Sequence, residues 1–392
     1  MRVLFLSHTG RMSGGERALL ELLRGLPGEV SPVVATPPGA LASALRQAGA
    51  DVTTVPAAEG SLRLHPLHTP IAVAAIARSA LAVGRIARRE GADVIHANSI
   101  RSGLVAVLAH RLGAPPPVVY VHDCLPDSRV ANATRRAILR GAGVVLANSD
   151  HTAANFAAGL PRADVRTTYN GMIDESGRLV ELDGAEPPER EEARARLGLA
   201  GEPLLGVVAQ ITPWKGQDTA IDAIPAVRRE HPGARLLLAG EAKFTGAGTR
   251  FDNRAHLERL RARVAELELA DHVEFLGERR DALDVIAALD VLLAPSWEEP
   301  FGRTIVEAMS VGTPVVATSV GGPAEIVEDG LSGRLVPPRN APRLAEAVLD
   351  LAADPDRRRR MAEEGRRAAA TRFTLRAHAG DVIAAYRDSV AG

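Results

Sequence analysis

Short apolar runs alternate with longer segments of helical periodicity along almost the whole chain. The runs are continuous stretches of Val, Leu, Ile and Ala, which is typical of strands buried on both faces of a parallel sheet. The segments between them repeat apolar residues at the spacing of an amphipathic helix. The pattern therefore predicts an α/β fold built from doubly wound, Rossmann-like parallel sheets. The predicted strands cover residues 3–7, 32–35, 51–55, 93–96, 118–122, 143–147, 204–209, 235–239, 273–276, 291–294 and 315–317.

The alternation breaks once, where glycine, proline and clustered glutamates interrupt it between residues 173 and 202. At 392 residues the chain is too long for one ordinary hydrophobic core, so two domains are expected. We predict a first domain over residues 1–172, a linker over 173–202 and a second domain over 203–373. Two such domains imply a cleft between them, with ligands beyond the carboxyl ends of the strands.

The most informative stretch covers residues 291–322, where two predicted strands flank a helix predicted over residues 301–309. Glu299 stands just before that helix, and Glu307 follows eight residues later. If the chain between them were wholly helical, this offset would span about 12 Å, the length of a nucleotide diphosphate sugar from ribose to hexose. The N–H groups at the helix start suit a diphosphate, and carboxylates accept hydrogen bonds from hydroxyl groups. The alternative is two surface glutamates in an ordinary strand–helix–strand unit.

Further polar residues follow other predicted strands. Lysine occurs only at Lys215 and Lys243, and Lys215 precedes a glycine and a predicted helix, where it suits an anionic ligand. A solvated surface lysine is the alternative. His122 ends a predicted strand, where it suits a sugar hydroxyl, an acceptor or a cap of the next turn. His96 and Asn98 leave the same choice open, and the backbone of residues 277–280 could meet a nucleobase edge.

Several other functions lack their sequence features. The glycines Gly10, Gly14 and Gly15 do not fit the dinucleotide-binding spacing, which disfavours a nicotinamide-dependent dehydrogenase. No His/Cys spacing indicates zinc, and neither a Walker A motif nor a G-x-S-x-G motif is present. Asp354 and Asp356, which flank a proline, favour a helix cap over a metal site. We therefore expect neither a metal nor a cofactor.

Composition and charge indicate which partners and which cell compartment to expect. The net charge is −1 and aromatic residues make up 3% of the chain, which disfavours a nucleic-acid partner. A single cysteine, Cys124, rules out an intramolecular disulfide, and the first residues lack a signal-peptide pattern, so we expect a cytoplasmic protein. The apolar run at 71–86 contains Arg78 and Arg85, and we expect it to fall short of a membrane span and to pack as a helix, with any membrane contact peripheral.

These motifs resemble those of the retaining GT-B glycosyltransferases, in the family that contains the glycosyl transferases group 1 (glycosyltransferase family four). The resemblance covers most of the chain. An E-x7-E pattern falls on Glu299 and Glu307 within EEPFGRTIVE, and the phosphate-binding lysine falls on Lys215 within WKGQ. The remaining matches are the glycine turn Gly321 and Gly322, the first-domain glycines Gly14 and Gly15, the first-domain histidine His122, the pair Asn170 and Gly171, and a final helix (374–392) that crosses back onto the first domain.

The resemblance implies a role for each matching residue. Glu307 would bind the ribose, Glu299 the transferred sugar and Lys215 the diphosphate, while the backbone of Phe301 and Gly302 would contact the sugar. His122 would face the cleft. One position differs from the family pattern. The family usually has an arginine five residues before the lysine, and this chain has Gln210 there. A neutral amide does not neutralise phosphate charge, so Arg303 and Arg279 are candidates to compensate.

The expected function is sugar transfer from a nucleotide diphosphate sugar, with retention of anomeric configuration and without a metal. Family habit favours uracil as the base. The acceptor would be a hydroxyl of a small polar molecule, a glycan or a lipid carrier, in secondary-metabolite or cell-envelope biosynthesis. Two alternatives are a sugar-nucleotide 2-epimerase of the same fold and a catalytically degenerate protein that binds nucleotide sugars.

Overall fold

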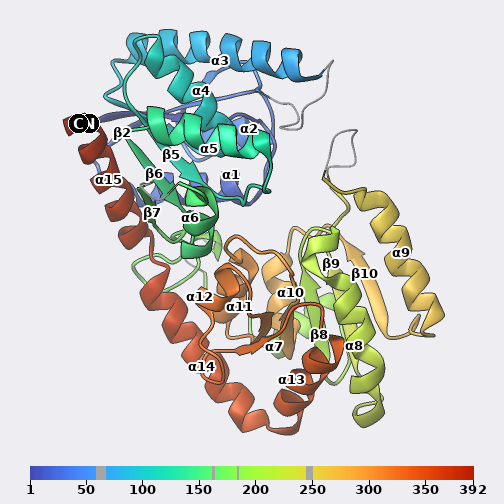
Figure 1. Cartoon of the computed structure of the whole chain (residues 1–392). Helices are drawn as coiled ribbons and strands as arrows, with labels where there is room; N and C mark the ends of the chain where they lie inside the picture. The colour runs from blue at the N-terminus through green and yellow to red at the C-terminus, as the bar shows by residue number, and fades with distance from the viewer. Residues whose placement is uncertain (59–67, 161–163, 183–184, 244–249) are drawn as a thin grey trace. The chain divides into compact units, whose positions relative to one another are not determined.

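The computed structural model describes residues 1–58, 68–160, 164–182, 185–243 and 250–392. The chain forms two compact units (Figure 1). The first comprises Met1–Glu175 together with Phe373–Gly392, and the second comprises Ser176–Arg372. Each unit is an α/β structure with its own fully parallel sheet, so the predicted fold class is confirmed.

The first unit contains a seven-stranded sheet in the order β3-β2-β1-β4-β5-β6-β7. Its strands are the apolar runs of the sequence, with successive side chains on opposite faces. The edge strand β7 was not predicted, because its three residues are only partly buried. The strands are β1 (Arg2–Leu6), β2 (Ser31–Thr36), β3 (Asp51–Thr54), β4 (Val94–Ala97), β5 (Pro117–Val121), β6 (Val144–Ala147) and β7 (Val165–Thr167).

Helices cover both faces of this sheet. Val3 and Phe5 of β1 point into a core shared with α1 (Gly14–Gly25), α2 (Ala40–Gln47) and α15 (Leu375–Ala391). Leu4 and Leu6 point to the opposite core. The helices that contribute to that second core are α3 (His68–Glu90), α4 (Ile100–Arg111), α5 (Arg129–Gly141) and α6 (Asp150–Ala157).

The second unit contains a six-stranded sheet in the order β10-β9-β8-β11-β12-β13. Helices α8, α9 and α13 pack into its largest core, and α10 and α11 contact strands β8, β11 and β12. The strands are β8 (Leu204–Val208), β9 (Arg235–Ala239), β10 (Val273–Gly277), β11 (Val291–Ala294), β12 (Val315–Thr318) and β13 (Arg334–Val336). The helices are α7 (Arg190–Leu197), α8 (Gln217–Glu230), α9 (Asn253–Glu266), α10 (Ala282–Ala288), α11 (Arg303–Val311), α12 (Gly322–Ile326), α13 (Ala341–Ala353) and α14 (Pro355–Arg372), with 3₁₀ turns at Val180–Leu182 and Pro213–Lys215.

The predicted linker at 173–202 differs from the structure, in which residues from Ser176 onward belong to the second unit. Helix α7 is held there by Arg194, whose guanidinium donates to Ala288 O at 2.8 Å and to Asp290 Oδ2 at 2.7 Å. The same carboxylate accepts from Leu204 N at 2.8 Å, at the first residue of β8. A glutamate-rich composition had suggested a connection, but these buried polar contacts attach the segment to the sheet.

Helix α3 departs from expectation in one respect. Among the described residues it is the one helix that is long and apolar enough, over Pro70–Glu90, to cross a membrane by length and composition, so the prediction that this run falls short was wrong. Of its most apolar 18-residue stretch, 33% is buried. Ala80, Val83 and Ala87 lie in the core of the first unit, so the helix packs on the sheet as predicted.

Candidate functional site

The predicted residues of the second unit gather at the carboxyl edge of its sheet. Lys215 lies in the 3₁₀ turn after β8, and Glu299 lies in the loop after β11. Gly321 and Gly322 follow β12. Because all six strands run parallel, these three loops meet at one edge, where open α/β sheets bind their ligands.

Lys215 and Glu299 form an ion pair at this edge. Lys215 Nζ lies 2.5 Å from Glu299 Oε2, and the same oxygen accepts from the Ser296 hydroxyl at 3.2 Å. Glu299 is 9% exposed, and the Lys215 side chain is 16% exposed. The ammonium also lies 4.2 Å from the centre of the Trp214 ring. The lysine is therefore fixed by a carboxylate and an aromatic face instead of extending freely into solvent.

Two glycines let the surrounding loops approach closely. A Cβ atom added to Gly322 would lie 2.0 Å from Phe301 O, and Gly322 N donates to Glu299 O at 2.9 Å. Gly216 has φ +71°, and its Cβ would lie 2.1 Å from Pro295 O. No other residue type fits these positions without moving the backbone that carries Glu299.

Helix α11 begins two residues later than predicted. Its N-cap is Gly302, whose φ of +109° ends the irregular segment, and the helix runs from Arg303. The offset from Glu299 to Glu307 is therefore not wholly helical, and its helical part, from Arg303, rises only about 6 Å. The N-cap Gly302 has no side chain that could cap the first turn of α11. Its N–H groups and positive dipole end suit an anion next to the Lys215–Glu299 pair.

Glu307 is buried on α11, and Arg303 lies beside it. Arg303 Nη2 is 3.7 Å from Glu307 Oε1 and 3.7 Å from Glu181 Oε1. The start of α11 is tied to the sheet by Thr304, whose hydroxyl donates to Val208 O at 3.2 Å. Of the two arginines proposed to compensate for Gln210, Arg303 is thus the one on the helix that carries Glu307.

Arg279 follows β10 and is bound elsewhere. It donates to both carboxylate oxygens of Asp281, at 2.8 and 2.6 Å, and this contact raises the pKa of Arg279 and lowers the pKa of Asp281. The side-chain amide of Gln210 donates to Lys243 O at 3.4 Å. Neither residue is positioned by a contact with Lys215 or Glu299.

A second polar cluster lies in the first unit, around His122. His122 Nε2 lies 3.1 Å from Asn98 Oδ1, and the Asn98 amide donates to Gly15 O at 2.8 Å. A Cβ atom on Gly15 would touch the His122 ring at 3.4 Å, and the Tyr120 ring centre lies 4.2 Å from that ring. The structure thus joins His122 to Gly15, which follows Gly14 in the first turn of α1.

His96 and Asn98, whose roles the sequence left open, lie in different surroundings. Asn98 belongs to the His122 cluster, whereas His96 is a fully buried core residue whose Nδ1 lies 2.8 Å from the Tyr386 hydroxyl. Sequence reasoning missed Glu16, a buried carboxyl that accepts from Ser13 and whose pKa is raised, mainly by burial. A carboxyl residue directly after the glycine pair of the loop was the available signal.

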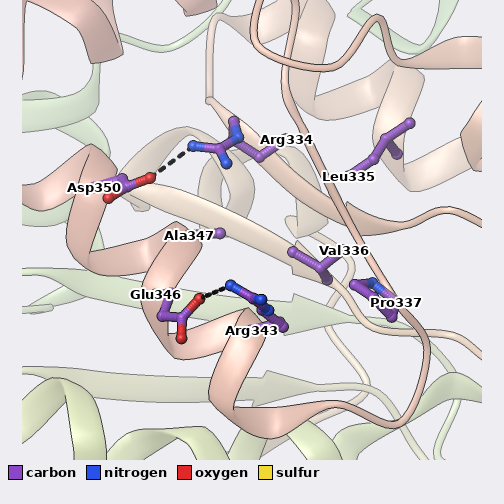
Figure 2. Close-up of a pocket in the computed structure, with 8 residues that line it drawn as sticks. All are labelled: Arg334, Leu335, Val336, Pro337, Arg343, Glu346, Ala347 and Asp350. Atoms are coloured by element: carbon purple, nitrogen blue, oxygen red, sulfur yellow. Dashed lines mark hydrogen bonds and ion pairs between the residues drawn. The ribbon is translucent and has the colours of Figure 1, made fainter.

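A cavity of about 530 Å³ lies away from these residues, between β13 and α13 (Figure 2). Its charged residues pair with one another, Arg334 with Asp350 at 2.8 Å and Arg343 with Glu346 at 2.6 Å. It contains none of the predicted site residues. At the end of α13, Asp354 accepts from Arg357 N at 2.8 Å, which confirms the predicted helix cap.

Known proteins match this chain over both units. The family model described as Glycosyl transferases group 1 matches residues 189–368, and that described as Glycosyltransferase Family 4 matches residues 12–175. The D-inositol 3-phosphate glycosyltransferase of Segniliparus rotundus is 33% identical over 316 residues, which cover 76% of this chain and 67% of that protein. A GDP-mannose-dependent alpha-(1-6)-phosphatidylinositol monomannoside mannosyltransferase of Mycobacterium tuberculosis is 32% identical over 247 residues, 60% of each chain.

A solved structure agrees with these sequence matches. Anabaena Alr3699/HepE, in complex with UDP-glucose, is similar to this chain with a TM-score of 0.80 and 27% sequence identity. The similarity covers 98% of this chain and 99% of that one. Both units, and with them both polar clusters, therefore lie within the compared region.

Proposed function

Since the chain belongs to the glycosyl transferases group 1 and has their GT-B fold, we propose that it transfers a hexose from a UDP-linked donor to a hydroxyl group with retention of anomeric configuration. Use of a nucleotide sugar follows from the family. The observation that carries the finer proposal is the Lys215–Glu299 pair, with Glu299 three residues before Gly302, the glycine N-cap of α11. It offers a cation and a helix N-terminus to a diphosphate, and a carboxylate to sugar hydroxyls.

In the proposed reaction, the bond from the sugar C1 to the diphosphate oxygen breaks while a bond from C1 to the acceptor oxygen forms on the same face. The acceptor proton passes to the departing phosphate. Lys215 neutralises the charge that develops on this leaving group, which is the kind of preorganised contact that stabilises a transition state most. Glu299 orients the sugar, and the buried Glu307 accepts from the ribose hydroxyls. In this scheme the residues bind and orient, and we propose that no metal is required.

Relatives support a choice of donor and acceptor class. Anabaena Alr3699/HepE was solved with UDP and with UDP-glucose and covers nearly the whole chain, which favours UDP. The M. tuberculosis relative is GDP-mannose-dependent, so GDP donors are the competing choice. Inositol phosphate and phosphatidylinositol monomannoside appear in the names of relatives, which favours an acceptor that presents a cyclitol or sugar hydroxyl. We propose that the first-unit cluster of Gly14, Gly15, Asn98 and His122 contacts the acceptor, and that the enzyme is cytoplasmic.

Thermal-shift titrations with UDP, GDP and their hexose conjugates test the donor. A ligand at a hundred times its Kd stabilises the folded state by about 2.7 kcal/mol, so the correct nucleotide raises the melting temperature measurably. We expect UDP and a UDP-hexose to give the largest shift. A larger shift with GDP would overturn the choice of base, and no shift with any of them would overturn the function.

Product analysis then tests the chemistry. Incubation of the preferred donor with D-inositol 3-phosphate or a related cyclitol in excess EDTA should give an α-linked glycoside from an α-linked donor, identified by proton NMR. A β-linked product would contradict retention, and loss of activity in EDTA would contradict metal independence. Conversion of the donor to an isomer of equal mass without an acceptor would identify a 2-epimerase instead.

A further inference from the structure

The chain carries glutamine at position 210, where the family resemblance calls for a phosphate-binding arginine. The Gln210 side chain contacts the loop after β9. Its side-chain amide donates to Lys243 O at 3.4 Å, and the backbone carbonyl of Gln210 accepts from the side-chain amide of Gln217 at 2.9 Å. The side chain that replaces the arginine therefore binds the backbone of the second of the two lysines in this protein.

The loops after β8 and β9 are in direct backbone contact. Gly240 has φ +146°, and a Cβ atom there would lie 1.9 Å from Ala209 O. Ile211 N donates to Glu241 O at 2.9 Å. The Lys243 carbonyl accepts from a second amide, that of the buried Asn253 at the start of α9. These contacts fix the Lys243 backbone beside position 210, so its long side chain starts next to the place that an arginine would occupy.

The Lys243 ammonium pairs with Glu278, which follows β10. The two side chains are 41% and 52% exposed. An ion pair as exposed as this contributes little to stability and is easily exchanged. A diphosphate carries more charge than one carboxylate and accepts several hydrogen bonds. The Lys243 ammonium can therefore exchange its ion pair with Glu278 for one with the diphosphate. Lys215, in contrast, is held in a more buried pair.

We propose that Lys243 supplies the second cation for the donor diphosphate, in place of the arginine that is missing at position 210. Glu278 holds this ammonium when the site has no donor and competes with the phosphate for it. The second cation then comes from the loop after β9 instead of the loop after β8, and Gln210 holds the backbone of the loop after β9. This inference rests on the proposed function, because it assigns a further contact to the same diphosphate.

Calorimetric titration of the full-length protein with UDP, and with uridine as a probe that lacks phosphate, tests the assignment. Lys243→Met should weaken UDP binding about tenfold or more, the value of a charge-assisted hydrogen bond, and should leave uridine binding unchanged. Glu278→Gln breaks the same ion pair but keeps the cation, so it should tighten UDP binding. A purely structural ion pair would make both variants weaken UDP binding alike, and that result would overturn the proposal.

A matched control and a rescue complete the experiment. Arg235 and Glu274 form an exposed pair at 2.7 Å between the same two strands, β9 and β10, with Arg235 at the first residue of β9. Arg235→Met removes one cation there and should not change UDP affinity. In the Lys243→Met background, Gln210→Arg should restore most of the lost affinity. Failure of this rescue, or an equal loss for uridine and UDP, would contradict a role for Lys243 at the diphosphate.

The same titrations distinguish failure of the Lys243 assignment from failure of the proposed function. If wild-type protein binds UDP and Lys215→Ala weakens that binding while Lys243→Met does not, the inference fails and the proposed function stands. GDP serves as the second probe in the same protocol if it proves to be the preferred nucleotide. If wild-type protein binds neither nucleotide, the proposed function fails and the inference fails with it.

Discussion

Lys215 Nζ lies 2.5 Å from Glu299 Oε2, so the residues expected to bind the diphosphate and the transferred sugar contact each other directly. Ser296 donates to the same carboxylate oxygen, so two groups hold Oε2 of Glu299 in place. A donor that binds here meets a cation whose position is already set. Such preorganisation would cost no rearrangement during the reaction, which is why the proposed mechanism centres on this pair.

Lys215→Ala should reduce kcat at least about a hundredfold, because one preorganised contact to developing charge contributes about 3–4 kcal/mol. The effect of Glu299→Gln should not add to it, since the two side chains share one interaction. A double-mutant cycle on kcat measures this coupling. Arg263→Met, which removes an exposed cation 2.7 Å from Asp222 in the same unit, is the matched control and should retain activity. Near-wild-type turnover of Lys215→Ala would remove the lysine from the mechanism.

Glu307→Ala should weaken binding of the nucleotide itself, because the buried carboxylate is assigned to the ribose hydroxyls. Loss of two hydrogen bonds to a charged acceptor predicts at least about a tenfold higher Kd for UDP, measured by calorimetry. Glu346→Ala, in the cavity between β13 and α13, controls for removal of an acidic side chain. Unchanged UDP affinity in Glu307→Ala would exclude the ribose role.

Gly322→Ala should disturb the site through the backbone. The new methyl group would lie 2.0 Å from Phe301 O and would push the turn after β12 away from the loop after β11, which carries Glu299. We expect about 1–3 kcal/mol of destabilisation, seen in thermal unfolding, together with loss of turnover. At Gly233 the nearest atom to an added Cβ is Glu202 O at 3.6 Å, so Gly233→Ala is the matched control. Equal melting temperatures for the two variants would show that the close approach is not required.

The first unit should lose stability as the pH falls below 6.5. Burial lowers the pKa of His96 and of His378 from 6.5 to about 3, so both are neutral in the folded state. Between pH 6.5 and about 3 the unfolded chain binds more protons than the folded one. Stability is therefore complete above pH 6.5 and decreases on acidification. Each histidine should account for about 2 kcal/mol between pH 6.5 and pH 4.5.

Hydrogen–deuterium exchange of peptides from β4 and α15, in urea at pH 7 and pH 4.5, reports this unit by itself. His378→Leu should reduce the pH dependence, because among the described residues neither ring nitrogen of His378 has a hydrogen-bond partner whose loss would complicate the result. An identical pH dependence in the variant and the wild type would show that protonation of this histidine does not limit stability.

The sequence predicted the parallel sheets because their strands are continuous apolar runs, as in β5 and β11, and this signal is independent of tertiary contacts. It failed where structure depends on packing. Strands β7 and β13 have three residues each and both contain an arginine, so neither forms a continuous apolar run. The start of α11 is set by the left-handed conformation of Gly302, which sequence periodicity does not report.

In the candidate site, too, the sequence identified single residues but not the contacts between them. Glu299, Glu307 and Lys215 were identified from spacing and from the scarcity of lysine. The contacts that Ser296 makes with Glu299, and Asn98 with Gly15, join residues far apart in the sequence or too common to stand out. The contact by which Asp281 holds Arg279, one of the two arginines expected to compensate for Gln210, could not be read from the sequence either.

The position of the donor is the most direct test of the account. Crystals soaked with a UDP-hexose should show the diphosphate at Lys215 and the first turn of α11, the hexose against Glu299 and the ribose against Glu307. Density for the nucleotide at another edge of the sheet, or a clear nucleotide with no contact to Lys215, would contradict the proposed mechanism.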